Sequence, residues 1–187
     1  MKIRLAQPIQ PDSIVDGEGI RTVIWTQGCS HNCPGCHNPE THSFDKGIIK
    51  DIEELKEEIS NLRNQDGITL SGGDPLFQVE QSLEIAKHAH SIKLNVWCYT
   101  GFTFEKLIAM SSFNKKILEL LSNIDILIDG PFILNERSLN LKFRGSRNQR
   151  IINVKESLKK GYPVLVKKYH REKKYVPIAK KEKHIYI

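Results

Sequence analysis

Three cysteines lie within eight residues of one another, at Cys29, Cys33 and Cys36, with the spacing C-x3-C-x2-C. The fourth cysteine of the chain, Cys98, is far from them in the sequence. Iron–sulfur clusters are normally held by four thiolates, and a metal site that performs chemistry keeps a coordination position open. We therefore expect a loop that holds a [4Fe-4S] cluster through three irons and leaves the fourth iron free for a ligand.

Two other interpretations of this loop remain open on spacing alone. A structural zinc site could recruit His31, His37 or His42 as a fourth ligand, although zinc ligands usually come as separated pairs. Cys33 and Cys36 also form a C-x-x-C pair, which suits a redox dithiol, but the thioredoxin-like context is missing. The spacing favours the cluster over both.

The remaining composition is that of a soluble cytoplasmic domain. The chain has 187 residues, of which 39% are hydrophobic, and it has no apolar run of the roughly 18 residues that a membrane span needs. Residues 1–10 lack the long apolar segment of a signal peptide. Thiols stay reduced in the cytoplasm, so clustered cysteines there indicate a metal site. Cys98, inside an apolar run, is expected to be a buried strand residue.

The positive charge is concentrated at the C-terminus. Residues 155–187 hold 11 of the 28 Lys and Arg residues but only 3 of the 22 acidic ones, so the rest of the chain is slightly acidic. The body therefore lacks the basic footprint of a nucleic-acid-binding protein, and neither nucleic acid nor membrane is expected as a partner. The basic C-terminal segment is interpreted as a solvated extension, with docking to an acidic partner as the alternative.

Apolar runs alternate with amphipathic ones along the chain. Strands are predicted over 21–27, 67–71, 94–99 and 124–128, with shorter candidates at 150–154 and 162–166. Helices are predicted over 51–63, 77–90 and 104–122, the last with a break at 111–112, and a helical turn over 155–160. This βα order predicts an α/β fold with a mainly parallel sheet.

Each of the four main predicted strands ends in an unusual loop. The cysteine loop follows the first, and residues 71–75, 99–101 and 129–132 follow the other three. Ligands of such folds gather at the C-terminal ends of parallel strands. The predicted loop 28–50 is also much longer than the usual two to six residues, which is typical of a functional loop. We expect the site at this edge.

Two further segments allow two interpretations each. Gly72 and Gly73, followed by Asp74, would let the backbone approach a ligand ammonium group, or they form an ordinary strand-to-helix turn. Residues 144–150 contain three arginines that suit carboxylate or phosphate recognition, or they form a solvated charged loop.

Taken together and in order, these segments resemble the radical S-adenosylmethionine (SAM) superfamily, and more closely the activating proteins of anaerobic ribonucleoside-triphosphate reductases. The resemblance spans residues 12 to about 166 and rests on the segments 16–21, 27–38, 71–75, 99–101, 125–132 and 144–149. Two positions depart from the wider superfamily. Gly35 stands where an aromatic residue is common, and Asp74 replaces the more usual glutamate.

The resemblance implies a partial, open TIM-like barrel over residues 1–168, with the cluster loop at 28–50 and a basic extension at 169–187. It also implies which residues contact the cofactors. The cluster ligands would be Cys29, Cys33 and Cys36; the methionine ammonium of SAM would meet Gly72, Gly73 and Asp74; and the adenine would lie beside Gly35, Cys36 and His37.

The implied activity is that of a radical SAM oxidoreductase whose chemistry is carried by its cofactors, so no catalytic side chain is expected. One electron from the cluster splits SAM, and the resulting radical removes a hydrogen atom from a glycine of the anaerobic reductase. An external one-electron donor such as a flavodoxin would be needed. The alternatives are an activase of the formate-lyase type, which is usually longer, and a non-catalytic zinc-binding adaptor.

Overall fold

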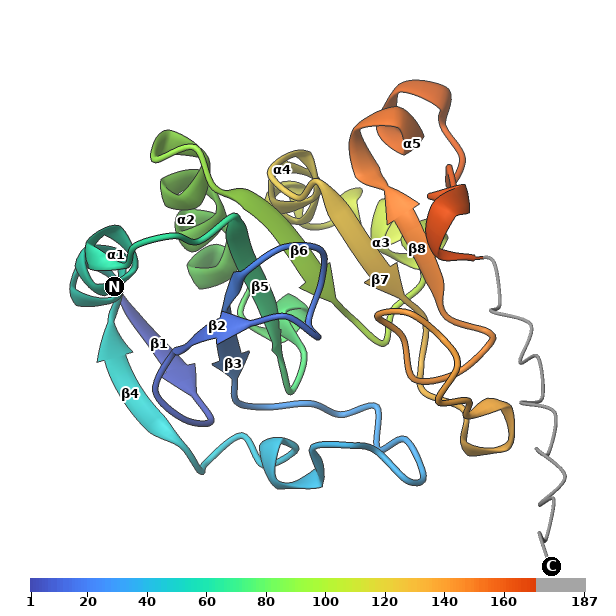
Figure 1. The fold of residues 1–187 in the computed structure, drawn as a ribbon, viewed down its shortest axis with the longest axis horizontal. Coiled ribbons are helices and arrows are strands. Elements are labelled where there is room, and N and C mark those ends of the chain that lie inside the picture. Colours follow the sequence, from blue (N-terminus) through green and yellow to red (C-terminus); the bar gives the residue numbers. More distant parts are fainter. Residues whose placement is uncertain (171–187) are drawn as a thin grey trace, which may run out of the picture.

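The computed structural model describes residues 1–170 and has an eight-stranded sheet at its centre (Figure 1). All but the first two residues of the predicted extension 169–187 lie outside the described part. The strands are β1 (Lys2–Leu5), β2 (Gln10–Ser13), β3 (Arg21–Thr26), β4 (Ile48–Asp51), β5 (Gly67–Gly72), β6 (Asn95–Tyr99), β7 (Ile126–Asp129) and β8 (Arg150–Asn153).

The helices follow the amphipathic runs predicted from the sequence. They are α1 (Ile52–Asn61), α2 (Val79–Ser91), α3 (Phe104–Ser111), α4 (Lys115–Ser122) and α5 (Val154–Lys160). Asp51 caps α1 by accepting from the backbone N–H of Glu53 at 2.8 Å. The predicted break at 111–112 is confirmed, because Asn114 caps a new helix, α4. No helix within residues 1–170 is both long and apolar enough to cross a membrane.

The four central strands are parallel, in the order β3-β5-β6-β7, which confirms the mixed α/β class with a mainly parallel core. Antiparallel strands complete the sheet: β1, β2 and β4 on one side and β8 on the other. The strand predicted at 162–166 is wrong. Leu165 forms only an isolated bridge with Ile152, and Pro163 has no N–H to extend the pairing.

The sheet buries a different apolar cluster on each face, since successive side chains of a strand point to opposite sides. Val96, Cys98 and Leu127 belong to the larger core, to which residues of helices α1 to α4 also contribute. Trp97 and Ile128 point the other way, into a smaller cluster. Cys98 is fully buried, which confirms the interpretation of this residue as part of a strand.

The smaller cluster lies beside a buried arginine. The Nε of Arg21 donates to Thr69 Oγ1 at 2.7 Å, and Nη1 donates to Asn95 Oδ1 at 2.8 Å and to the carbonyl oxygen of Glu18 at 3.0 Å. The guanidinium carbon also lies 5.2 Å from the centre of the Trp97 ring. Burial lowers the pKa of Arg21 to about 10. The motif at residues 16–21 therefore ties the loop before β3 to β5 and β6.

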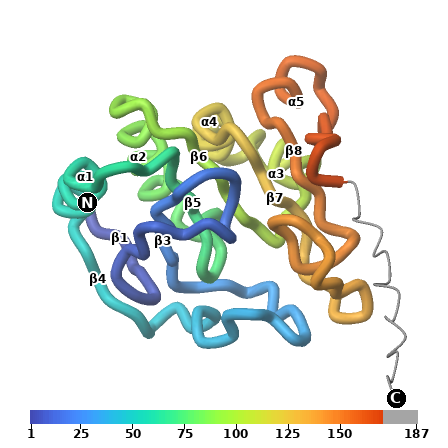
Figure 2. Tube along the Cα trace, in the orientation of Figure 1, coloured from blue at the N-terminus to red at the C-terminus, as the bar shows by residue number. Residues whose placement is uncertain are grey.

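The long loops lie at the C-terminal edge of the parallel strands. Figure 2 traces the segment between β3 and β4 and the segment between β7 and β8 along this same side of the sheet. The predicted loop 28–50 is shorter than expected, because its last residues pair with β1 as the edge strand β4. The unusual loops meet where the sequence predicts the site.

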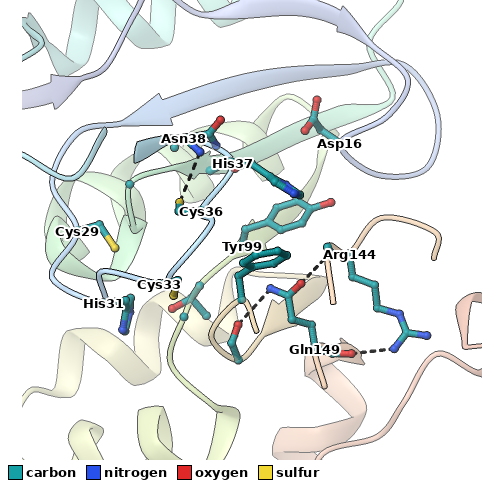
Figure 3. A pocket seen from close by; sticks show the side chains of 18 of the residues that line it. Asp16, Cys29, His31, Cys33, Cys36, His37, Asn38, Tyr99, Arg144 and Gln149 are labelled. Atoms are coloured by element: carbon teal, nitrogen blue, oxygen red, sulfur yellow. Dashed lines mark hydrogen bonds between the residues drawn. The ribbon is translucent and has the colours of Figure 1, made fainter. Parts of the chain in front are cut away.

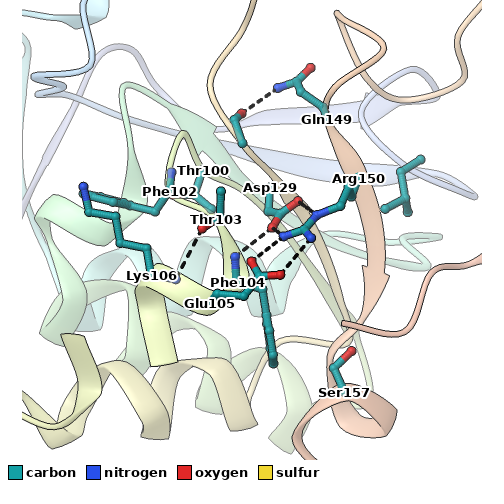
Figure 4. A network of polar contacts seen from close by, with 12 residues as sticks. Thr100, Phe102, Thr103, Phe104, Glu105, Lys106, Asp129, Gln149, Arg150 and Ser157 are labelled. Carbon is teal, nitrogen blue, oxygen red and sulfur yellow. Dashed lines mark hydrogen bonds and ion pairs between the residues drawn. The ribbon is translucent and has the colours of Figure 1, made fainter. Parts of the chain in front are cut away.

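A polar network joins the last two strands to α3 (Figure 4). Asp129 is 1% exposed and accepts from the backbone N–H of Phe104 at 2.7 Å. The guanidinium of Arg150 donates to Asp129 Oδ1 at 2.9 Å and to both carboxylate oxygens of Glu105. Arg150 thus compensates the charge of a buried carboxylate.

Replacing Arg150 by Met should leave Asp129 buried and uncompensated, so we expect a loss of about 3–5 kcal/mol in the free energy of unfolding. Urea unfolding measures this, with Arg63→Met as the control because Arg63 is exposed beyond the end of α1. A loss below about 1 kcal/mol, the usual size for a surface ion pair, would contradict the role of Arg150.

Candidate functional site

A cavity of about 440 Å³ opens at the C-terminal edge of the sheet. Its walls come from the cysteine loop and from the loops that follow β5, β6 and β7. Cys29, Cys33 and Cys36 all line it, and Figure 3 shows their sulfur atoms on one side of the pocket. The structure therefore brings the three predicted ligands to a single cavity.

The turn between the second and third cysteines has a specific shape. The backbone N–H of Cys36 donates to the carbonyl oxygen of Cys33 at 3.0 Å, with Pro34 and Gly35 between them. Gly35 has a φ of +73°, which a type II turn requires at this position. This turn accounts for glycine in place of an aromatic residue. Gly35 itself is not part of the cavity lining.

The three thiols differ in environment. Cys29 is buried and Cys33 and Cys36 are half-buried. Burial raises the pKa of the Cys29 thiol to about 11, against the opposing effect of a hydrogen bond from the backbone of His31. The sulfur of Cys36 accepts from the backbone N–H of Asn38 at 3.4 Å.

The glycine pair after β5 lets two loop backbones touch. Gly72 has a φ of +103°, which disfavours any side chain. A Cβ atom on Gly73 would lie 2.5 Å from the carbonyl oxygen of Gly28, at the start of the cysteine loop. Both glycines also line the cavity. The pair therefore serves a close backbone approach and at the same time exposes backbone to the cavity.

Asp74 does not line the cavity and is 1% exposed. Its Oδ2 accepts from Thr100 Oγ1 at 2.9 Å and from the backbone N–H of Gly101 at 3.0 Å, and lies 2.8 Å from His31 Nε2. Its Oδ1 accepts from the backbone N–H of Leu76 at 2.9 Å. The carboxylate, predicted to receive an ammonium group, is thus surrounded by donors of the protein.

Aromatic side chains form another part of the cavity wall. His37 lies beside Phe132, with ring centres 5.0 Å apart, and both line the cavity with Tyr99. The Tyr99 hydroxyl donates to the carbonyl oxygen of Phe143 at 2.9 Å, which joins this wall to the last loop. Among the predicted adenine contacts, Cys36 and His37 do line the cavity. The aromatic wall was not predicted, although residues 99–101 and 129–132 were singled out as loops.

The segment 144–150 mainly holds its own loop. Arg144 Nη1 donates to the carbonyl oxygens of Arg147 and Gln149, the latter at 2.9 Å. Gln149 Oε1 accepts from the backbone N–H of Gly145 at 2.8 Å. Arg144 and Gln149 nevertheless line the cavity, whereas Arg150 belongs to the Asp129 network. The three arginines therefore do not form one anion site.

Within residues 1–170, no three His, Cys, Asp or Glu side chains are close enough together to hold a single metal ion. His31, His37 and His42, the candidate fourth ligands of a zinc site, all line the cavity.

Comparison with known proteins identifies relatives over most of the chain. The family model described as "4Fe-4S single cluster domain" matches residues 15–152. An anaerobic ribonucleoside-triphosphate reductase-activating protein of Haemophilus influenzae is 34% identical over 153 residues, covering 78% of this chain and 95% of the relative. The proteins of the same name from Enterobacteria phage T4 and Escherichia coli K12 are 35% and 30% identical, covering 76% and 78% of this chain and 90% and 96% of theirs.

A solved structure, QueE from Escherichia coli, overlaps only partly with the chain. The TM-score is 0.47 at 15% identity, over 55% of this chain and 54% of that one. A likeness this partial supports no inference about function.

The environments of the four thiols predict an order of alkylation in the metal-free protein. Cys33 and Cys36 should react first with iodoacetamide because they are half-buried. Cys29 should react at least about tenfold more slowly, because it is buried and its raised pKa leaves little thiolate. Cys98 should react only on unfolding, since it is fully buried and its pKa is raised by burial. Peptide mass spectrometry over time measures this order, and early labelling of Cys98 would contradict it.

Proposed function

The chain belongs to the 4Fe-4S single cluster domain family and to the anaerobic ribonucleoside-triphosphate reductase-activating proteins, and from this premise we propose that it activates such a reductase by radical SAM chemistry. One observation carries the proposal: the three thiols of the family's cluster motif line a single cavity at the sheet edge. The enzyme is then an oxidoreductase whose product is a glycyl radical on its protein partner.

The three cysteine side chains that line the cavity are suitable ligands for an iron–sulfur cluster. Cys29, Cys33 and Cys36 would hold the [4Fe-4S] cluster, and three ligands leave one iron open. When bound and reduced, the cluster would supply one electron for the cleavage of SAM, the chemistry by which a hydrogen atom would be removed from the partner's glycine.

Other residues of the cavity would bind and orient SAM. Gly72 and Gly73 present backbone to the cavity and would receive the methionine ammonium, with the negative charge of Asp74 behind them. Cys36 and His37 would lie beside the adenine, with Gly35 setting the turn that places them. The rings that line the cavity would limit the access of water to a reactive radical.

Loading the cluster must release a proton from Cys29. Its raised pKa keeps the metal-free thiol protonated at neutral pH, and only the thiolate is a metal ligand. Cluster binding is therefore coupled to deprotonation of a buried group.

Several finer points belong to this proposal. The parallel strands β3, β5, β6 and β7 would form a partial, open TIM-like barrel of the radical SAM type, within a domain at residues 1–168. The protein would be cytoplasmic, where thiols stay reduced. Its one-electron chemistry would need an external electron donor such as a flavodoxin. The basic extension at 169–187 would remain outside this domain.

Replacing Cys33 by Ala should abolish SAM cleavage while leaving most of the fold, because only two thiolates would remain for the cluster. The test is anaerobic reconstitution with iron and sulfide, followed by electron paramagnetic resonance of the reduced protein with and without SAM. The natural chain should give a [4Fe-4S] signal that changes when SAM is added. Cys98→Ala is the matched control, since Cys98 lies in the core away from the cavity.

Each other result would count against a different part of the proposal. Cleavage by Cys33→Ala with a bound cluster would contradict the ligand assignment. A cluster indifferent to SAM would remove the radical mechanism, and zinc without iron would restore the adaptor alternative. Activation of a formate lyase in place of the ribonucleotide reductase would identify the other activase class.

A further inference from the structure

The loop that carries the cysteines is held near its middle by the side chain of His31. His31 lies between Cys29 and Cys33 in the sequence, and its Nε2 is 2.8 Å from Oδ2 of Asp74, the residue after the glycine pair. Resting on the proposed function, we propose that Asp74 anchors the cluster loop through His31 and is not a direct ligand of the methionine ammonium. His31 is then a positioning residue for the cluster.

The hydrogen bonds of Asp74 support this role. One carboxylate oxygen faces His31, Thr100 and Gly101, and the other accepts from the backbone N–H of Leu76. A carboxylate oxygen has about two lone pairs, so the first oxygen is already saturated. The side chain is 1% exposed and does not line the cavity. A ligand ammonium at Oδ2 would have to displace one of these protein donors, and burial separates Oδ1 from the cavity.

The surroundings of His31 are built to hold its ring in place. The ring packs edge-on against Phe102, with centres 4.6 Å apart, and lies 5.8 Å from Phe77. A Cβ atom on Gly101 would lie 2.4 Å from His31 Cδ2, so glycine is needed there to make room. The histidine side chain is 18% exposed. Packing and hydrogen bonding thus select the same ring position.

This anchor explains two sequence features that SAM binding leaves unexplained. Thr100 and Gly101, which follow β6, both donate to the Asp74 carboxylate. Aspartate in place of glutamate also follows, because only the shorter side chain readily bonds the N–H two residues on, here that of Leu76. The loops after β3, β5 and β6 therefore meet at one carboxylate.

The anchor should control access to the buried Cys29 in the metal-free protein. The backbone of His31 hydrogen-bonds the Cys29 thiol, so release of His31 would free that thiol as well. Local opening of the loop would expose Cys29 without unfolding the core that contains Cys98. The ratio of the two labelling rates then separates loop release from unfolding.

The test compares two amides at position 31. In His31→Gln the amide nitrogen can reach the position of Nε2 and bond Asp74, whereas in His31→Asn it is too short. We expect His31→Asn to raise the iodoacetamide labelling rate of Cys29 about tenfold, the loss of one hydrogen bond to a charged group. His31→Gln should stay near the natural rate. His88→Asn, on α2 and away from the cavity, is the matched control.

Asp74→Asn distinguishes an anchor from an ammonium ligand. If Asp74 is an anchor, Asp74→Asn should raise the labelling rate of Cys29. The double variant with His31→Asn should label little faster than either single variant, because both substitutions remove the same contact between His31 and Asp74. Equal Cys29 rates in His31→Asn and His31→Gln would overturn the proposal. The proposal would also be overturned if Asp74→Asn left the labelling rate of Cys29 unchanged but weakened SAM binding to the reconstituted protein about tenfold or more.

The labelling readout needs neither cluster nor SAM. Failure of the natural reconstituted chain to bind SAM would therefore count against the proposed function, while the labelling rates would still decide whether His31 and Asp74 anchor the loop. Labelling of Cys98 in step with Cys29 would report global unfolding and contradict a local anchor.

Discussion

The site depends on the continuation of the β3–β5 pairing beyond the ends of both strands. The N–H of Gly73 donates to the carbonyl oxygen of Thr26 at 2.7 Å, and the N–H of Asp74 donates to that of Gly28 at 3.0 Å. These bonds join the start of the cysteine loop directly to the loop after β5. Because parallel strands place their C-terminal ends together, the cavity inherits its position from the sheet.

The opposite end of the same strands supplies rigidity. Arg21 at the beginning of β3 bonds Thr69 of β5 and Asn95 of β6, so three parallel strands are tied together by one buried guanidinium. At the other side of the sheet, Arg150 ties β8 to Asp129 and α3. The loops that form the cavity are therefore carried by strands whose relative positions are set by buried polar contacts as well as by apolar packing.

Sequence patterns predicted the parallel core and the edge where the loops meet, because both follow from local periodicity and from general topology. They did not predict β1, β2 or β4, although the equally short β7 and β8 were predicted. β2 has the sequence Gln-Pro-Asp-Ser without a β-branched or aromatic side chain, and β1 and β4 pair with each other from positions far apart in the sequence. The direction of the Asp74 side chain was equally beyond local reasoning. It is set by His31, 43 residues earlier, and by Thr100, 26 residues later, and no spacing rule connects those positions.

Because the three thiols lie on one loop, the backbone of that loop must hold them in position relative to one another. Ligands drawn from separate strands are positioned by the sheet, whereas Cys29, Cys33 and Cys36 can only be as well placed as the backbone between them. The turn at Pro34 and Gly35 sets the last two relative to each other. The backbone N–H of Cys29 donates to the carbonyl oxygen of His42 at 3.0 Å, which leaves the span between Cys29 and Cys33 to be constrained. His31 lies in the middle of that span, so its contact with Asp74 and the packing of its ring against Phe102 together constrain the span.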